Sequence, residues 1–164
     1  MILKRENINP LWTERRDGNP VRIFQPRPKI NGFPNAMIMS VLLNSEYTRI
    51  DFSFTYDIYD IRVPVYVISP EIRLVTAAQR STYTPERSFS LIRFENAPIW
   101  PKKYEAGSKN DRLYFTLYFA PLPLYTLEFD IIESDDEDDG PMMNYLEINL
   151  DKGERKWEIK NSEN

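Results

Sequence analysis

Apolar and polar residues alternate along several short segments of this chain, a pattern that predicts β-strands with one buried face. The clearest segment is residues 49–56, where Ile50, Phe52, Phe54 and Tyr56 fall on one side and mostly polar residues on the other. A helix would scatter these four apolar residues around its axis, so the pattern excludes a helix here. Four further segments alternate in the same way: residues 61–67, 113–119, 127–131 and 146–150.

Other strands are predicted from weaker patterns. Residues 36–43 form a continuous apolar run, which fits a strand buried on both faces or a short helix. We favour the strand, because Pro34-Asn35 precedes the run and Asn44-Ser45 follows it after a strand-like length. Residues 72–77, 89–94 and 156–160 complete the set. About eight or nine short strands separated by Pro and Gly indicate a β-sandwich or a barrel.

The composition also favours strands over helices. The chain contains ten Tyr and nine Phe, types that suit a half-buried pleated surface. Thirteen Pro indicate short elements with stiff connections, because Pro breaks helix interiors. We therefore predict an all-β antiparallel sandwich. Its predicted core consists of apolar residues from the alternating segments: Ile50, Phe52, Phe54, Val63, Val65, Leu113, Phe115, Leu117, Phe119, Leu127, Phe129, Ile131, Leu146 and Ile148.

Residues 1–35 have a different character from the rest of the chain. They contain five Pro, seven Lys or Arg and three acidic residues, whereas residues 128–151 carry ten acids and no base. We predict an extended, proline-rich basic arm over 1–35, with a short edge strand at 21–24, and a sandwich domain over 36–160. Thirty-odd residues of this kind hardly bury a core of their own. Opposite charge favours docking of the arm near the acidic end or onto an acidic partner, with Trp12, Ile23 and Phe24 as apolar anchors.

Three segments carry a resemblance to a known group of proteins. They are Leu113-Tyr-Phe-Thr-Leu-Tyr-Phe-Ala-Pro-Leu-Pro123, Leu127-Glu-Phe-Asp-Ile-Ile-Glu133 and Tyr145-Leu-Glu-Ile-Asn-Leu150. This succession resembles a pattern in uncharacterised bacterial proteins, common in Bacteroidota, that carry immunoglobulin-like sandwiches of the telokin-like type. The resemblance covers residues 45–151 and implies an immunoglobulin-like antiparallel β-sandwich with no established enzymatic activity.

The residue types present restrict the chemistry of the chain. Neither Cys nor His occurs, which excludes disulfides, thiolate catalysis, histidine bases and the usual zinc ligands. A carboxylate-only hydrolase is the one enzyme class that stays open. No spacing selects a catalytic pair from the carboxylates near strands, which are Asp51, Asp57, Asp60, Asp130 and Glu133. We therefore predict that the protein is not an enzyme and has no cofactor.

The acidic segment 133–140 is the most conspicuous local motif. Its oxygen ligands suit Ca²⁺, but the spacing does not match an EF-hand loop. Blocks of like charge are usually solvated, so we predict an exposed, mobile loop and no metal site. The weak alternative is a divalent-cation site made by Asp135, Asp136, Asp138 and Asp139.

Aromatic residues are the candidates for binding. Tyr114, Thr116 and Tyr118 form a stripe on the polar side of a strand, and Tyr and Trp are enriched at interfaces. The predicted binding residues are Trp12, Phe24, Tyr114 and Tyr118. The alternative is that a sandwich simply uses Tyr on its outer strands, because Tyr favours β-structure.

These observations lead to three functional hypotheses. The first is a non-catalytic protein-interaction or scaffold module with a protein partner or a second copy. The alternatives are a structural subunit of a larger assembly, of phage or secretion type, and a carbohydrate-binding sandwich with Trp12 or Trp100 as a stacking platform. Nucleic acid is disfavoured by the sequence pI of about 5.0. No apolar run long enough for a membrane span and no signal-like start are seen, so we predict a cytoplasmic location and no membrane partner.

Overall fold

The computed structural model describes residues 22–33, 35–55, 65–76, 87–105, 112–134, 143–150 and 154–155. These residues contain β-strands and no helix, which confirms the all-β prediction for this part of the chain. The strands are β1 (Arg22–Phe24), β2 (Pro28–Asn31), β3 (Ala36–Leu43), β4 (Thr48–Thr55), β5 (Val65–Tyr66), β6 (Arg73–Thr76), β7 (Arg87–Glu95), β8 (Tyr104–Glu105), β9 (Arg112–Phe119), β10 (Glu128–Ile132), β11 (Tyr145–Asn149) and β12 (Glu154–Arg155).

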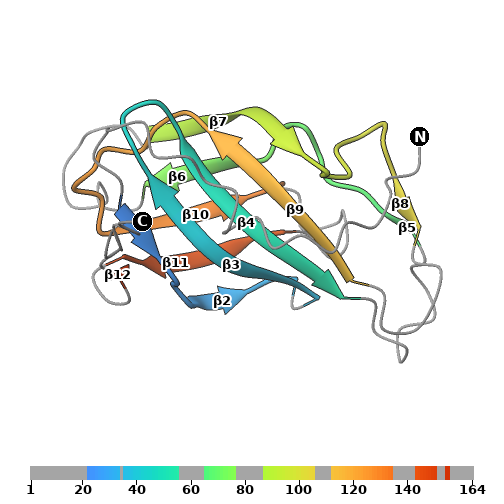
Figure 1. Cartoon of the computed structure of the whole chain (residues 1–164), viewed down its shortest axis with the longest axis horizontal. Coiled ribbons are helices and arrows are strands. Elements are labelled where there is room, and N and C mark those ends of the chain that lie inside the picture. The colour runs from blue at the N-terminus through green and yellow to red at the C-terminus, as the bar shows by residue number, and fades with distance from the viewer. Residues whose placement is uncertain are drawn as a thin grey trace, which may run out of the picture.

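Ten of these strands form one antiparallel sheet, in the order β12-β1-β3-β4-β9-β7-β6-β10-β11-β2. The sheet curls back on itself, so that β3, β4 and β9 lie in front of β10 and β11 (Figure 1). The curl is made at β7, whose residues 87–90 pair with β6 and whose residues 91–95 pair with β9. The ladder shifts register between Leu91 and Arg93, as at a β-bulge. Bulges bend a strand, which explains how β7 passes from one half of the sheet to the other.

The core lies between the two halves of the curled sheet. Phe52 of β4 stacks on Phe115 of β9, with ring centroids 5.0 Å apart, and lies 6.2 Å from the ring of Tyr145 on β11. The Tyr145 hydroxyl donates to the carbonyls of Phe33 and Ala36, so its buried polar end is satisfied. Aromatic contacts of this kind join the halves, because each aromatic ring removes a large apolar area from water.

Most of the predicted strands are confirmed. Residues 36–43 form β3 rather than a helix. β4 and β9 lie where alternation predicted strands, and β6 and β7 lie where the weaker patterns predicted them. The proline-containing segment after β9 is a connection, with a turn in which the Thr126 amide donates to the Pro123 carbonyl. The predicted strand over residues 156–160, together with Tyr56 and Val63, lies outside the described residues.

Two predicted core residues are wrong. Leu127 is 59% exposed, because β10 begins only at Glu128 and Leu127 still belongs to the connection. Leu146 is only half-buried, because β11 contains a bulge at Glu147, which has a φ of 55°. Across this bulge Phe129 faces Ile148 but Ile131 faces Tyr145, so Tyr145 takes the buried place that the strict alternation gave to Leu146.

Two segments of the predicted arm lie in the sheet. β1 pairs with β3, which confirms the strand expected near residues 21–24, but it is not an edge strand, because β12 pairs with its other side. β2 pairs with β11 at the opposite end of the sheet order, although no alternation marks it in the sequence. Residues 1–21 lie outside the described residues, and with them Trp12 and the predicted docking of the arm.

Candidate interaction surface

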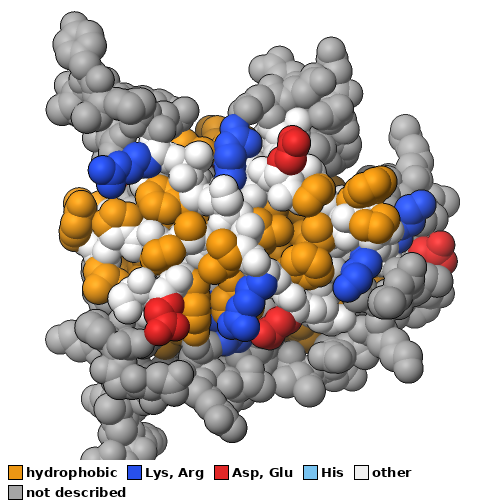
Figure 2. Space-filling model, turned by 90° about the horizontal axis from the view of Figure 1, so that it is seen from above, with side chains coloured by type: hydrophobic (Ala, Val, Ile, Leu, Met, Phe, Trp, Pro, Cys, Tyr) orange, Lys and Arg blue, Asp and Glu red, His pale blue; other side chains and the backbone are white. Residues whose placement is uncertain are grey.

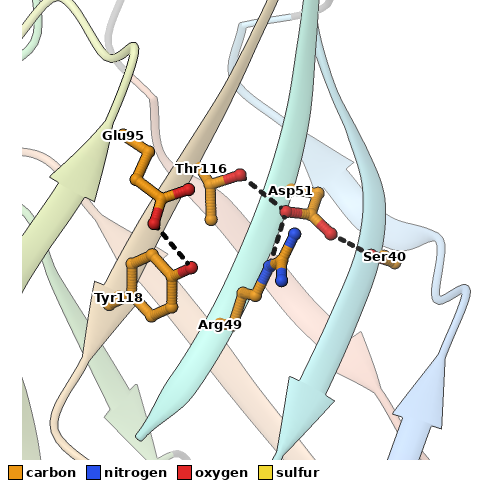
Figure 3. A network of polar contacts seen from close by, with 6 residues as sticks. All are labelled: Ser40, Arg49, Asp51, Glu95, Thr116 and Tyr118. Atoms are coloured by element: carbon orange, nitrogen blue, oxygen red, sulfur yellow. Dashed lines mark hydrogen bonds and ion pairs between the residues drawn. The ribbon is translucent and has the colours of Figure 1, made fainter. Parts of the chain in front are cut away.

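The face of β4 and β9 that points away from the core carries a buried polar network (Figure 3). The Asp51 carboxylate accepts hydrogen bonds from the hydroxyls of Ser40 on β3 and Thr116 on β9, both at 2.7 Å. Arg49 Nε lies 3.0 Å from Asp51 Oδ1 as an ion pair. All four residues are buried, so each of their polar groups needs a hydrogen-bond partner. The Asp51 carboxylate is the shared partner of the other three side chains.

Tyr118 lies beside this network and links it to β7. Its hydroxyl donates to Glu95 at 3.1 Å, the Arg93 guanidinium lies 3.9 Å from its ring centroid, and that of Arg49 lies 5.9 Å away. The Tyr47 ring meets it edge-on at 5.1 Å. Burial is the main reason that the pKa of Tyr118 is raised to about 12; Glu95 raises it further, and the Arg49 and Arg93 charges lower it.

The predicted binding residues occupy different places in the fold. Phe24 is fully buried in the core and Tyr118 is buried in the contacts just described. Tyr114 is half-buried, and its hydroxyl accepts a hydrogen bond from Arg112. Tyr114 and Tyr118 on β9 are therefore engaged in contacts within the chain, and Phe24 of β1 belongs to the hydrophobic core.

Three exposed apolar side chains lie on the second half of β7 or shortly after it. Ile92 is 54% exposed, Phe94 36% and Trp100, which follows shortly after the strand, 62%. The Lys102 ammonium lies 5.4 Å from the Phe94 ring centroid. Figure 2 looks down on the side that is uppermost in Figure 1, where β7 lies, and shows apolar side chains spread over it with charged side chains set apart from one another. We name Ile92, Phe94, Trp100 and Lys102 the β7 surface.

The backbone of β7 is also open at this place. Residues 91–95 pair with β9 on one edge, and among the described residues no strand pairs with the other edge. Arg93 and Glu95 alternate with the apolar residues and are held by Tyr118. The β7 surface thus combines an open strand edge with apolar side chains next to an ordered pair of charges.

Sequence reasoning missed the β7 surface for a physical reason. Residues 89–94 were recognisable as a strand, but nothing in the alternation shows that this strand divides its pairing between two neighbours. The bulge at Ile92 shifts the side chains that follow, so the strict period of two does not apply across it. Exposure of Ile92 and Phe94 follows from this tertiary arrangement.

The candidate catalytic carboxylates lie in separate local networks. Asp51 is engaged as described, and Asp130 accepts the Glu147 amide at 2.7 Å. Glu133 accepts the Ser69 amide at 3.0 Å and the Met143 amide at 2.8 Å. These bonds hold backbone segments in place, and they do not bring Asp51, Asp130 and Glu133 together as a pair or triad. Asp57 and Asp60 lie outside the described residues.

The base of the acidic loop is held by two side chains. The Glu133 carboxylate accepts the amide of Met143, which follows the loop, and that of Ser69 in a distant segment. Asn144 accepts the amides of Glu133 and Ser134 and donates to the Ser134 carbonyl. The alternative metal ligands Asp135, Asp136, Asp138 and Asp139 lie outside the described residues, as does the loop itself.

Comparison with known proteins gives no relative from which a role can be transferred. No protein-family model, curated protein or solved structure matches the chain. Within the described residues no helix has the length and apolar character of a membrane span.

Proposed function

We propose that this protein is a non-catalytic interaction module that binds an extended segment of a protein partner along the β7 surface. The observation that carries the proposal is a strand edge with which no described strand pairs, on a strand that exposes Ile92 and Phe94 and is followed by exposed Trp100. An added strand gains backbone hydrogen bonds from such an edge, and apolar side chains next to it supply specificity.

Simple energetics supports the assignment. An open edge with apolar side chains invites uncontrolled pairing, and proteins usually protect such edges with charges or cover. Fully burying one large apolar side chain contributes about 1.5–3 kcal/mol, and Phe94 and Trp100, which are 36% and 62% exposed, contribute the corresponding part of that figure when a partner covers them. Trp is also among the residues that most often dominate binding energy. Arg93 and Glu95, next to the edge, offer both charges to polar groups of a partner.

We also infer that the curled sheet is a two-layer sandwich of the immunoglobulin-like, telokin-like type. This inference rests on the resemblance of the β9, β10 and β11 segments, on the purely antiparallel strand pairs and on the passage of β7 from one half of the sheet to the other. Strands that change layers at a bend are typical of sandwiches.

A second candidate function is carbohydrate binding, and exposed Trp100 is the observation that favours it. An indole ring combines a large apolar face with a polar edge, which suits stacking on a sugar. A glycan array distinguishes the two: binding that Trp100→Ala abolishes supports a sugar site, and an array with no bound glycan excludes it.

The proposed function is tested with a phage-displayed library of random linear peptides. We expect the wild-type protein to select peptides with alternating apolar residues. Phe94→Lys and Trp100→Ser should each weaken the selected peptides about tenfold or more, because central interface residues often contribute over 1.4 kcal/mol. Isothermal titration calorimetry measures the affinity, and circular dichroism shows that each variant keeps its strands.

Met37→Lys is the matched control, since Met37 is an equally exposed apolar residue on β3, outside the β7 surface. It should leave affinity unchanged. Peptides that bind the Phe94 and Trp100 variants as tightly as the wild type would refute the proposal. Light scattering at rising concentration tests whether the partner is a second copy of this chain. If the wild type self-associates and Phe94→Lys does not, two copies bind each other through the edge of β7.

A further inference from the structure

The last three residues of β7 alternate between the two faces of the sheet. Arg93 lies directly opposite Tyr118 in the ladder, so its side chain points away from the core like that of Tyr118. The Glu95 carboxylate accepts the Tyr118 hydroxyl and lies on the same outer face (Figure 3). Phe94 lies opposite Leu117, a fully buried core residue, so Phe94 is on the core side.

Phe94 is partly exposed although it lies on the core side of the sheet. Among the described residues no strand pairs with β7 beyond this residue, so the core side of the sheet ends there. A strand added to this edge places a side chain directly opposite Phe94, on the same face. An apolar side chain in that place removes the exposed part of the ring from water.

The two charges on the outer face are held in position without being paired to each other. The Arg93 guanidinium lies 3.9 Å from the ring centroid of Tyr118 and 5.8 Å from that of Tyr47. These ring contacts use none of its hydrogen-bond donors, and within the described part of the chain the Arg93 side chain forms no hydrogen bond or ion pair. One oxygen of Glu95 accepts the Tyr118 hydroxyl, and the second is available to another donor. An added strand therefore meets one cation and one anion that are already ordered.

The order of these residues makes β7 complementary to itself. When two copies of the strand pair antiparallel with Phe94 opposite Phe94, Arg93 of each copy lies opposite Glu95 of the other. Opposite charges directly across two strands stabilise the pairing, and so do two aromatic rings that face each other.

Other registers of the same two strands lose this match. A shift of two residues places Arg93 opposite Arg93, or Glu95 opposite Glu95, and like charges directly opposite each other destabilise a sheet. A shift of one residue places a charged residue opposite Phe94, so the core sides of the two copies no longer lie on one side of the joined sheet. The sequence of the strand thus favours a single alignment.

We propose that two copies of this chain bind each other through β7, paired antiparallel about a two-fold axis at Phe94. Such an interface uses the same residues of both copies, as two-fold interfaces of homodimers do. The half of the sheet that contains β9 then continues into the same half of the second copy. This inference rests on the proposed function, and it names a second copy as the partner that supplies the extended segment.

Sedimentation velocity of the full chain at rising concentration is the test, and we expect a reversible dimer. Arg93→Glu and Glu95→Arg each place like charges at two positions across the interface, so each should weaken the dimer about tenfold or more. An equimolar mixture of these two variants has opposite charges at both positions again, so it should form heterodimers about as tightly as the wild type dimerises. Arg87→Glu is the matched control, because it reverses an exposed charge in the half of β7 that pairs with β6, and it should leave the dimer unchanged.

Circular dichroism of each variant shows that its strands are kept. A wild-type chain that stays monomeric at millimolar concentration overturns the inference, and the proposed function then depends only on the peptides that the protein selects. Single variants that dimerise as tightly as the wild type overturn the inference as well. So does a mixture that associates no more than either variant alone.

Discussion

Tyr118 shows how a single side chain is fixed on the outer face of the sheet. Its ring contacts the guanidinium groups of Arg93 and Arg49, while its hydroxyl donates to Glu95. Cation–π contacts of this kind strengthen when they are shielded from water. The sequence suggests that Tyr118 is exposed, but in the structure it is buried and holds Arg93 and Glu95 in place beside the edge of β7.

Tyrosine ionisation provides a test at this scale. Burial raises the pKa of Tyr66 and Tyr145 well above 10, and that of Tyr118 to about 12. The folded chain therefore holds these protons more tightly than the unfolded chain does. Their contribution to stability is complete below pH 10 and is lost as the pH rises toward 12 and above.

We expect absorbance at 295 nm to show tyrosines of the folded protein that ionise only above pH 10, an effect absent in guanidinium-unfolded protein. Tyr118→Phe should remove the increment near pH 12. If all ten tyrosines of the folded protein ionised together near pH 10, the buried environment of these phenols would be wrong.

At the scale of the elements, the Asp51 network ties three adjacent strands together. Ser40 on β3 and Thr116 on β9 both donate to the carboxylate of this β4 residue, in addition to its ion pair with Arg49. A slip of one residue along a strand would turn every side chain to the other face of the sheet. A polar network that is satisfied in one alignment only favours that alignment.

Asp51→Ala should destabilise the protein by about 3–5 kcal/mol, because it leaves the Arg49 charge buried without its carboxylate. Urea denaturation followed by tryptophan fluorescence measures this difference. Glu95→Gln, which alters an exposed carboxylate on the same face, should cost less than about 1 kcal/mol. Equal effects of the two substitutions would show that Asp51 is not buried as described.

The sequence predicts the strands well because alternation reports which face of a strand is buried. It locates β4 and β9 closely, and it distinguishes β3 from a helix by its flanking residues. It fails at Leu146, where the Glu147 bulge changes the side-chain period, and at β2, whose partner is distant in sequence. The open edge of β7 is set by which strands pair with it, and pairing cannot be read from one strand alone.

At the scale of the whole molecule, one strand differs from its neighbours in exposure. β4 and β9 are buried over most of their length, whereas β7 is exposed or half-exposed at every residue. The same strand joins the two halves of the curled sheet, so it lies where the sheet turns. Among the described strands, only β6 pairs with its first half and only β9 with its second half. A partner that adds a strand at residues 91–95 extends the half of the sheet that contains β9.

Hydrogen–deuterium exchange shows whether a bound peptide adds a strand to β7. The protein is compared with and without a linear peptide that it selects from the displayed library. We expect the amides of residues 91–95 to gain protection when the peptide binds, because an added strand pairs with the free edge of β7. Unchanged exchange along β7, with new protection at β2 or β12 instead, would contradict it.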